Sequence, residues 1–106
     1  MPKYILIYKS PDGFDMSLLP REEITKAMKA WGEWLGGMGP SVVDRGDMFK
    51  AGGKSVDGAG MQDETSHLSG YSIIDVANYD AALEAASGSP IIQTGGKVEV
   101  YEAFGL

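Results

Sequence analysis

Short apolar stretches bounded by turn residues recur along the chain, and several alternate between apolar and polar positions as β-strands do. Lys3–Lys9 (KYILIYK) is rich in aromatic and β-branched residues and ends at the turn sequence Ser10-Pro11-Asp12-Gly13. The same reasoning predicts strands at Ser41–Gly46, Leu68–Val76 and Lys97–Phe104, and Lys54–Asp57 could add a short one.

Two segments have helical periodicity. After Pro20, apolar residues recur every three or four positions from Ile24 through Trp31 and Trp34 to Met38, which predicts a long helix with one apolar stripe. We expect its two tryptophans in a core or an interface rather than in catalysis. A second, Ala-rich helix is predicted over Tyr79–Ser87, because Asn78 is a good N-cap and Gly88 and Pro90 follow.

The predicted order β-α-β-(β)-β-α-β is that of a ferredoxin-like α+β sandwich, in which two helices cover one face of a four-stranded antiparallel sheet. In Lys3–Lys9, however, Tyr4, Leu6 and Tyr8 alternate with Ile5 and Ile7, so that both faces of the strand are apolar. Because large apolar patches are rarely left bare, we expect a second copy to cover the open face.

The segment Asp47–Met61 is rich in glycine and has no apolar period, which predicts a loop or a hairpin and the most mobile part of the chain. Its glycines match neither a dinucleotide-binding nor a P-loop pattern. We therefore do not expect a phosphate site there.

The composition narrows the class of protein. With 106 residues the chain forms a single domain, residues 1–106, and 43% hydrophobic residues are ordinary for a globular protein. A net charge of −6 with scattered lysines and arginines argues against nucleic acid and anionic membranes as partners. The N-terminus lacks a signal peptide pattern and no stretch is long enough to span a membrane, so we expect a cytoplasmic protein.

His67 is the only histidine, and Asp63 and Glu64 precede it by four and three positions. A carboxylate that holds one ring nitrogen would make a general base of it, so these three residues are the candidate catalytic set. The alternative is a solvated loop histidine with acidic neighbours. Since the chain has one His and no Cys, we expect no metal and no cofactor.

A second set of residues could bind a ligand. Four aromatic residues, Tyr4, Tyr8, Trp31 and Tyr71, could line an apolar pocket between helix and sheet, or could simply belong to the core. Asp44 and Arg45, on the predicted second strand, could hold a polar group of a ligand, or could form a surface pair.

Three stretches resemble the YCII-related family, also called DGPF-domain proteins. They are the opening strand KYILIY, the segment from Trp31 and Trp34 to Gly46, and Leu68–Tyr101 with its L-x-G-Y-x-I-I-D-V run and G-G-x-V-E-V ending. In place of the family's D-G-P-F motif this chain has Val56-Asp57-Gly58-Ala59-Gly60-Met61, which keeps only Asp57-Gly58.

The resemblance implies a dimeric α+β barrel, in which two ferredoxin-like sheets pack face to face. Some members of the family are proposed to be enzymes that use a His–Asp pair, but that histidine lies in the first helix, where this chain has none. Three functions stay open: an isomerase or lyase with His67 as base, a binding module for a small apolar molecule, and a structural domain that contributes only its dimer face.

Overall fold

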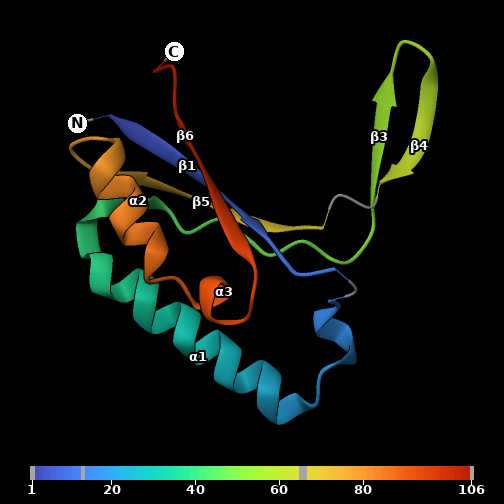
Figure 1. The fold of residues 1–106 in the computed structure, drawn as a ribbon, viewed down its shortest axis with the longest axis horizontal. Coiled ribbons are helices and arrows are strands. Elements are labelled where there is room, and N and C mark those ends of the chain that lie inside the picture. Colours follow the sequence, from blue (N-terminus) through green and yellow to red (C-terminus); the bar gives the residue numbers. More distant parts are fainter. Residues whose placement is uncertain (1, 13, 65–66, 106) are drawn as a thin grey trace.

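A computed structural model of the protein describes residues 2–12, 14–64 and 67–105, and its ribbon is drawn in Figure 1. The element order confirms every predicted helix and strand to within a few residues. The elements are β1 (Lys3–Lys9), α1 (Arg21–Met38), β2 (Val42–Asp44), β3 (Gly53–Asp57), β4 (Gly60–Glu64), β5 (Leu68–Asp75), α2 (Tyr79–Ser87), α3 (Pro90–Gln93) and β6 (Lys97–Glu102), with short 3-10 turns at Met16–Leu18 and Gly39–Ser41.

Four strands form one sheet in the order β2-β5-β1-β6, and each neighbouring pair is antiparallel. At the middle of the sheet Ile5 lies opposite Ile73 on β5 and Tyr101 on β6. The hairpin β3–β4 forms a separate two-stranded sheet. The fold is therefore mixed α+β, as the sequence predicts.

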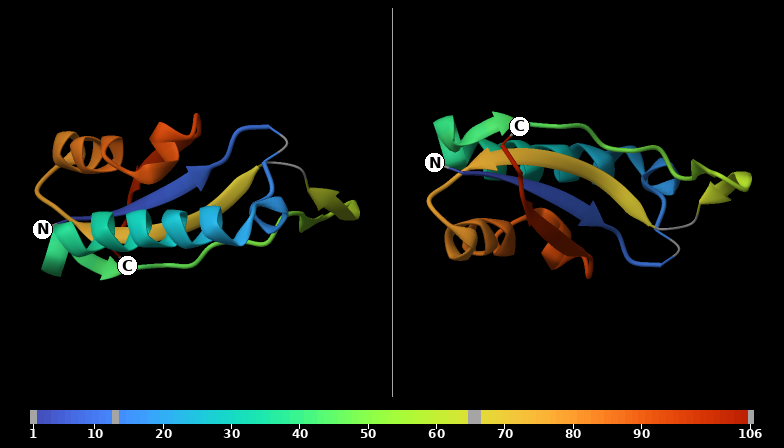
Figure 2. Two further views of the ribbon diagram at one scale, coloured as in Figure 1. Left: turned by 90° about the horizontal axis from the view of Figure 1, so that it is seen from below. Right: turned by 90° about the horizontal axis from the view of Figure 1, so that it is seen from above.

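The core lies on one face of the four-stranded sheet. Tyr4, Leu6 and Tyr8 of β1 are buried there with Ile74 of β5, and α1 and α2 cover them. Figure 2 shows this arrangement from two sides: α1 lies in front of the sheet from below and behind β1 and β5 from above. Ile5 and Ile7 alternate with the buried residues, so they belong to the uncovered face.

The helices are joined to each other and to the sheet by aromatic contacts. Trp34 of α1 donates its indole N–H to the backbone oxygen of Ala85 in α2, at 3.1 Å. The Trp31 ring packs edge-on against Tyr8, with centroids 4.7 Å apart. Both tryptophans pack against the core, as predicted.

Local sequence explains the helix ends. The Asn78 side chain accepts a hydrogen bond from the Ala81 N–H, at 2.9 Å, and so caps α2 as predicted. α1 has no side-chain cap, but it follows Pro20 and carries Glu22 and Glu23 in its first turn, where the helix dipole favours negative charge.

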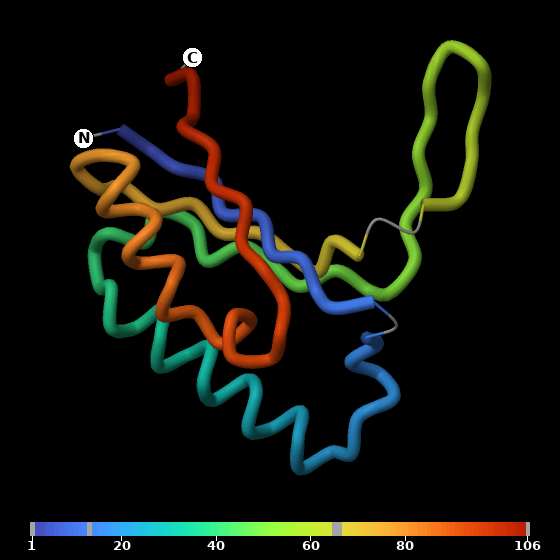
Figure 3. The backbone as a smooth tube through the Cα atoms, viewed as in Figure 1, coloured from blue at the N-terminus to red at the C-terminus, as the bar shows by residue number. Residues whose placement is uncertain are grey.

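Two features differ from the predictions. The predicted loop between α2 and β6 contains the short helix α3, which starts at Pro90, a residue that suits the first turn of a helix. The glycine-rich segment forms a hairpin whose second strand runs to Glu64, beyond the predicted limit at Met61. Figure 3 shows this hairpin projecting from the body of the molecule.

Candidate functional site

A cavity of about 620 Å³ lies between α1, the core face of the sheet and the segment that joins β1 to α1. Most of its wall is apolar, and aromatic rings and three methionine side chains make up much of it. The apolar members are Pro11, Phe14, Met16, Leu19, Ala27, Met28, Ala30, Trp31, Leu35, Met48, Pro90 and Ile91. Methionines make such a wall adaptable, because their side chains are flexible and polarisable.

The Tyr8 hydroxyl is a polar group deep in this wall. Its side chain is only 5% exposed. The hydroxyl donates to Ser72 Oγ at 2.7 Å, and Ser72 Oγ donates in turn to the backbone oxygen of Arg45, also at 2.7 Å. Burial raises the pKa of Tyr8 to about 12, while the contact with Ser72 acts in the opposite direction. Tyr8 is therefore protonated near neutral pH and serves as a hydrogen-bond donor, not as a base.

The end of β2 is fixed by Asp44. Its carboxylate accepts the Gly46 N–H at 2.8 Å and the Tyr71 hydroxyl at 3.3 Å. The negative charge of Asp44, followed by its hydrogen bond, raises the pKa of Tyr71. Tyr71 and Arg45 line the cavity, whereas Asp44 lies outside its wall and orients the turn that carries Arg45.

Two glycines allow the segment after β2 to lie against β5. A Cβ on Gly46 would stand 1.6 Å from the backbone oxygen of Tyr71, and Gly46 has a φ of 73° that glycine adopts without strain. A Cβ on Gly70 would stand 2.6 Å from the backbone oxygen of Asp47. These close approaches place Arg45 and Met48 at the cavity.

A second cavity, of about 710 Å³, adjoins the first at the base of the hairpin, and His67 lies in its wall. The imidazole is 43% exposed, and its Nε2 lies 3.4 Å from Asp12 Oδ1. His67 has a φ of 61°, a left-handed conformation that is uncommon for residues other than glycine. The two cavities share part of their walls, namely Ser10, Phe14, Met16, Met48 and Ser69.

The predicted partners of His67 are placed differently from the expectation. Asp63 accepts a hydrogen bond from Lys54 Nζ at 2.7 Å, and Glu64 accepts from Ser55 Oγ at 3.1 Å. Both carboxylates lie on β4, where Asp63 stands opposite Lys54 of β3 and Glu64 shares the wall of the second cavity with His67. The carboxylate at His67 is instead Asp12, which comes from the turn after β1.

Of the residues that the sequence suggests for a ligand site, Tyr8, Trp31, Arg45 and Tyr71 line the first cavity, whereas Tyr4 and Asp44 do not. Two residues were not anticipated: Ser72 in the wall of that cavity and Asp12 beside His67. Ser72 had one visible signal: it is a polar residue at a position of β5 that shares the parity of buried Ile74. Asp12 is far from His67 along the chain, and only the antiparallel pairing of β1 with β5 brings them together. No local pattern indicates that contact.

Neither a metal centre nor a membrane span is found within residues 2–12, 14–64 and 67–105. Three or more ligating side chains do not gather there, and the helices are too short or too polar to cross a bilayer.

Comparison with known protein families finds no matching family model, and comparison with curated proteins finds no match.

Proposed function

We propose that the protein binds a small, largely apolar molecule in the cavity between α1 and the sheet. The observation that carries this proposal is an apolar, aromatic cavity of about 620 Å³ with a buried hydroxyl in its wall. Ligand sites are typically cavities of this size with a few convergent polar groups. The apolar body of the ligand packs against Trp31, Leu35 and Ile91, and the polar groups around Tyr8 and Arg45 orient it.

Binding can be followed with the amphiphilic dye 8-anilinonaphthalene-1-sulfonate as the probe, through the tryptophan fluorescence of Trp31 in the cavity wall and of Trp34 beside it. Ala27→Phe places a ring in the cavity and should weaken dye binding about tenfold or more. Lys29→Phe adds the same ring on the same helix outside the cavity wall, and should leave binding unchanged. Equal effects of the two variants, or no saturable binding to the wild type, would contradict the proposal.

The chain is further proposed to be a ferredoxin-like, YCII-related protein. The strand order β2-β5-β1-β6, with the long helices on one face, supports this proposal. So do the stretches of sequence that resemble the family.

A homodimer is part of the same proposal, because the uncovered sheet face has the anatomy of an interface. Ile5, Ile7 and Ile73 form its centre, and charged residues such as Lys97 and Glu99 lie at its edge. Protein interfaces commonly combine an apolar centre with a polar rim. Light scattering coupled to size exclusion should give the mass of two chains at micromolar concentration, and a folded monomer would contradict the dimer.

A general-base enzyme is the second candidate function. The observation that favours it is the contact of His67 with Asp12 at the wall of the second cavity, which adjoins the first. A ligand in the first cavity could present an acidic C–H toward His67, as isomerase or lyase chemistry requires. If turnover is found, His67→Gln should abolish it while dye binding to the first cavity is kept.

A further inference from the structure

The hairpin β3–β4, residues 53–64, is an arm with an exposed apolar pair. Val56 and Met61 face each other across the two strands, so their side chains lie on one side of the arm. Val56 is 72% exposed and Met61 is 86% exposed. Lys54 and Asp63 extend the same side with an ion pair at 2.7 Å.

Few contacts within its own chain stabilise the arm. Its two strands pair with each other, and it shares no extensive contact with another helix or strand of the described residues. An isolated two-stranded hairpin is only marginally stable in water. A second surface that covers Val56 and Met61 would stabilise it.

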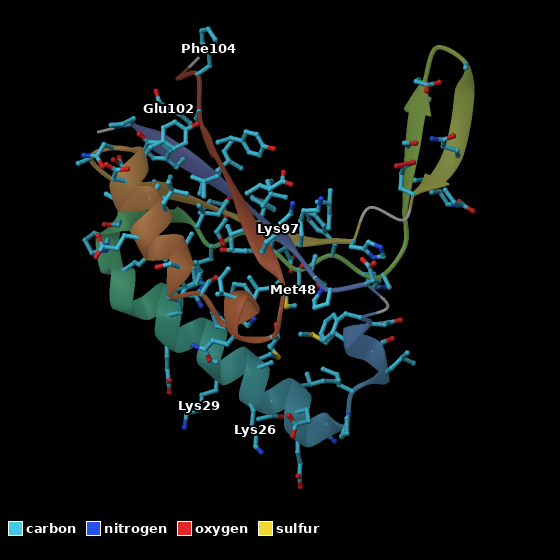
Figure 4. The ribbon with its side chains drawn as sticks, in the orientation of Figure 1. Lys26, Lys29, Met48, Lys97, Glu102 and Phe104 are labelled. Atoms are coloured by element: carbon cyan, nitrogen blue, oxygen red, sulfur yellow. The ribbon has the colours of Figure 1, made fainter. Side chains whose placement is uncertain are left out.

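The arm lies beside the uncovered sheet face. It leaves the sheet where β5 begins and rises on the side away from α1 and α2 (Figure 1). At the other end of the sheet, β6 leads into Phe104, which is 95% exposed and projects from the body (Figure 4). The open face is thus flanked by two apolar projections, one at each end of the strands.

The area of the sheet face indicates why a dimer needs these projections. Four strands about 4.8 Å apart, with β1 of seven residues at about 3.4 Å each, span roughly 400 Å² in plan. The accessible surface of the side chains is larger than this projected area. A standard stable interface nevertheless buries about 800 Å² on each partner, which is about twice the projected area of the sheet face. The arm and the segment around Phe104 supply additional apolar surface next to the face.

We propose that the arm of each copy clasps the other copy at the end of the sheet that carries Phe104. This proposal rests on the proposed homodimer. If the two-fold axis lies between the two sheets and perpendicular to the strands, it places each arm beside the Phe104 end of the other copy, so the contact is made twice. An axis parallel to the strands would instead bring arm against arm, and each arm carries three carboxylates, Asp57, Asp63 and Glu64, for one Lys54. Repulsion disfavours that alternative.

Site-specific cross-linking tests the clasp directly, because the chain has no cysteine and a single one can be introduced without ambiguity. Met61→Cys, labelled with benzophenone maleimide and irradiated, should give a covalent dimer whose cross-linked peptide comes from the C-terminal segment around Phe104. Lys29→Cys, on the far side of α1 (Figure 4), is the control and should give no covalent dimer.

The dimer affinity supplies a second measurement. Met61→Asp should raise the dimer dissociation constant about tenfold or more, as loss of a buried interface anchor does. Gln62→Asp adds the same charge to the neighbouring residue on the other side of the arm, and should change that constant by less than about threefold.

The outcomes separate the two proposals. A wild type that dimerises, without a cross-link from position 61 to the C-terminal segment, overturns the clasp and leaves the dimer standing. A monomeric wild type overturns the dimer itself, and the clasp with it. Equal weakening by Met61→Asp and Gln62→Asp also overturns the clasp.

Discussion

Alkaline titration of Tyr8 is the most direct test of how the cavity wall is built. Burial raises the pKa of Tyr8 from 10.0 in the unfolded chain to about 12 in the folded one. The folded state therefore holds this proton more tightly, and its contribution to stability is fully present below pH 10 and lost as the pH rises through 12. Two pKa units correspond to about 2 to 3 kcal/mol in the free energy of unfolding.

The assay compares the wild type with Tyr8→Phe by urea denaturation at pH 8, 10 and 12. At pH 8 the variant should be less stable by about 1 kcal/mol, because it loses the hydrogen bond to Ser72. By pH 12 the wild type should have lost about 2 to 3 kcal/mol more than the variant has. Ser72→Ala serves as the control: it removes the same hydrogen bond but keeps the buried Tyr8 hydroxyl, so it should keep the pH dependence of the wild type. If the free energies of unfolding of the wild type and of Tyr8→Phe change with pH in parallel, the conclusion that the Tyr8 hydroxyl is buried is refuted.

Two further predictions concern the sheet and its neighbouring turn. Ile74→Lys should unfold the chain, because it places a charge at a site that is 0% exposed. Ile5→Lys, on the open face, should leave the circular dichroism spectrum unchanged and split the proposed dimer. A folded Ile74→Lys or a dimeric Ile5→Lys would contradict this assignment of faces. Gly46→Ala should cost about 2 kcal/mol in urea denaturation, because its Cβ would meet the Tyr71 backbone and its φ is positive; unchanged stability would show that the turn relaxes freely.

The sequence by itself determined the elements and their order. The strands at Lys3–Lys9 and Leu68–Asp75 and the helix at Tyr79–Ser87 follow from short-range signals: β-branched runs, the Asn78 cap and the breakers after each element. The same alternation predicted two apolar faces of β1. It could not say which face meets the helices, because Tyr4 and Ile5 are both apolar and only the position of α1 and α2 distinguishes them.

Tertiary structure alone decided the site. Tyr8 and Ser72 are 64 residues apart, and their hydrogen bond exists because β1 and β5 pair in one register. Asp12 lies at His67 for the same reason, while Asp63, though closer in sequence, is bonded to Lys54 across the hairpin, and Glu64 accepts from Ser55. Proximity in sequence does not predict these contacts, because successive side chains of a strand point to opposite faces of the sheet. The register with the partner strand decides which side chains become neighbours.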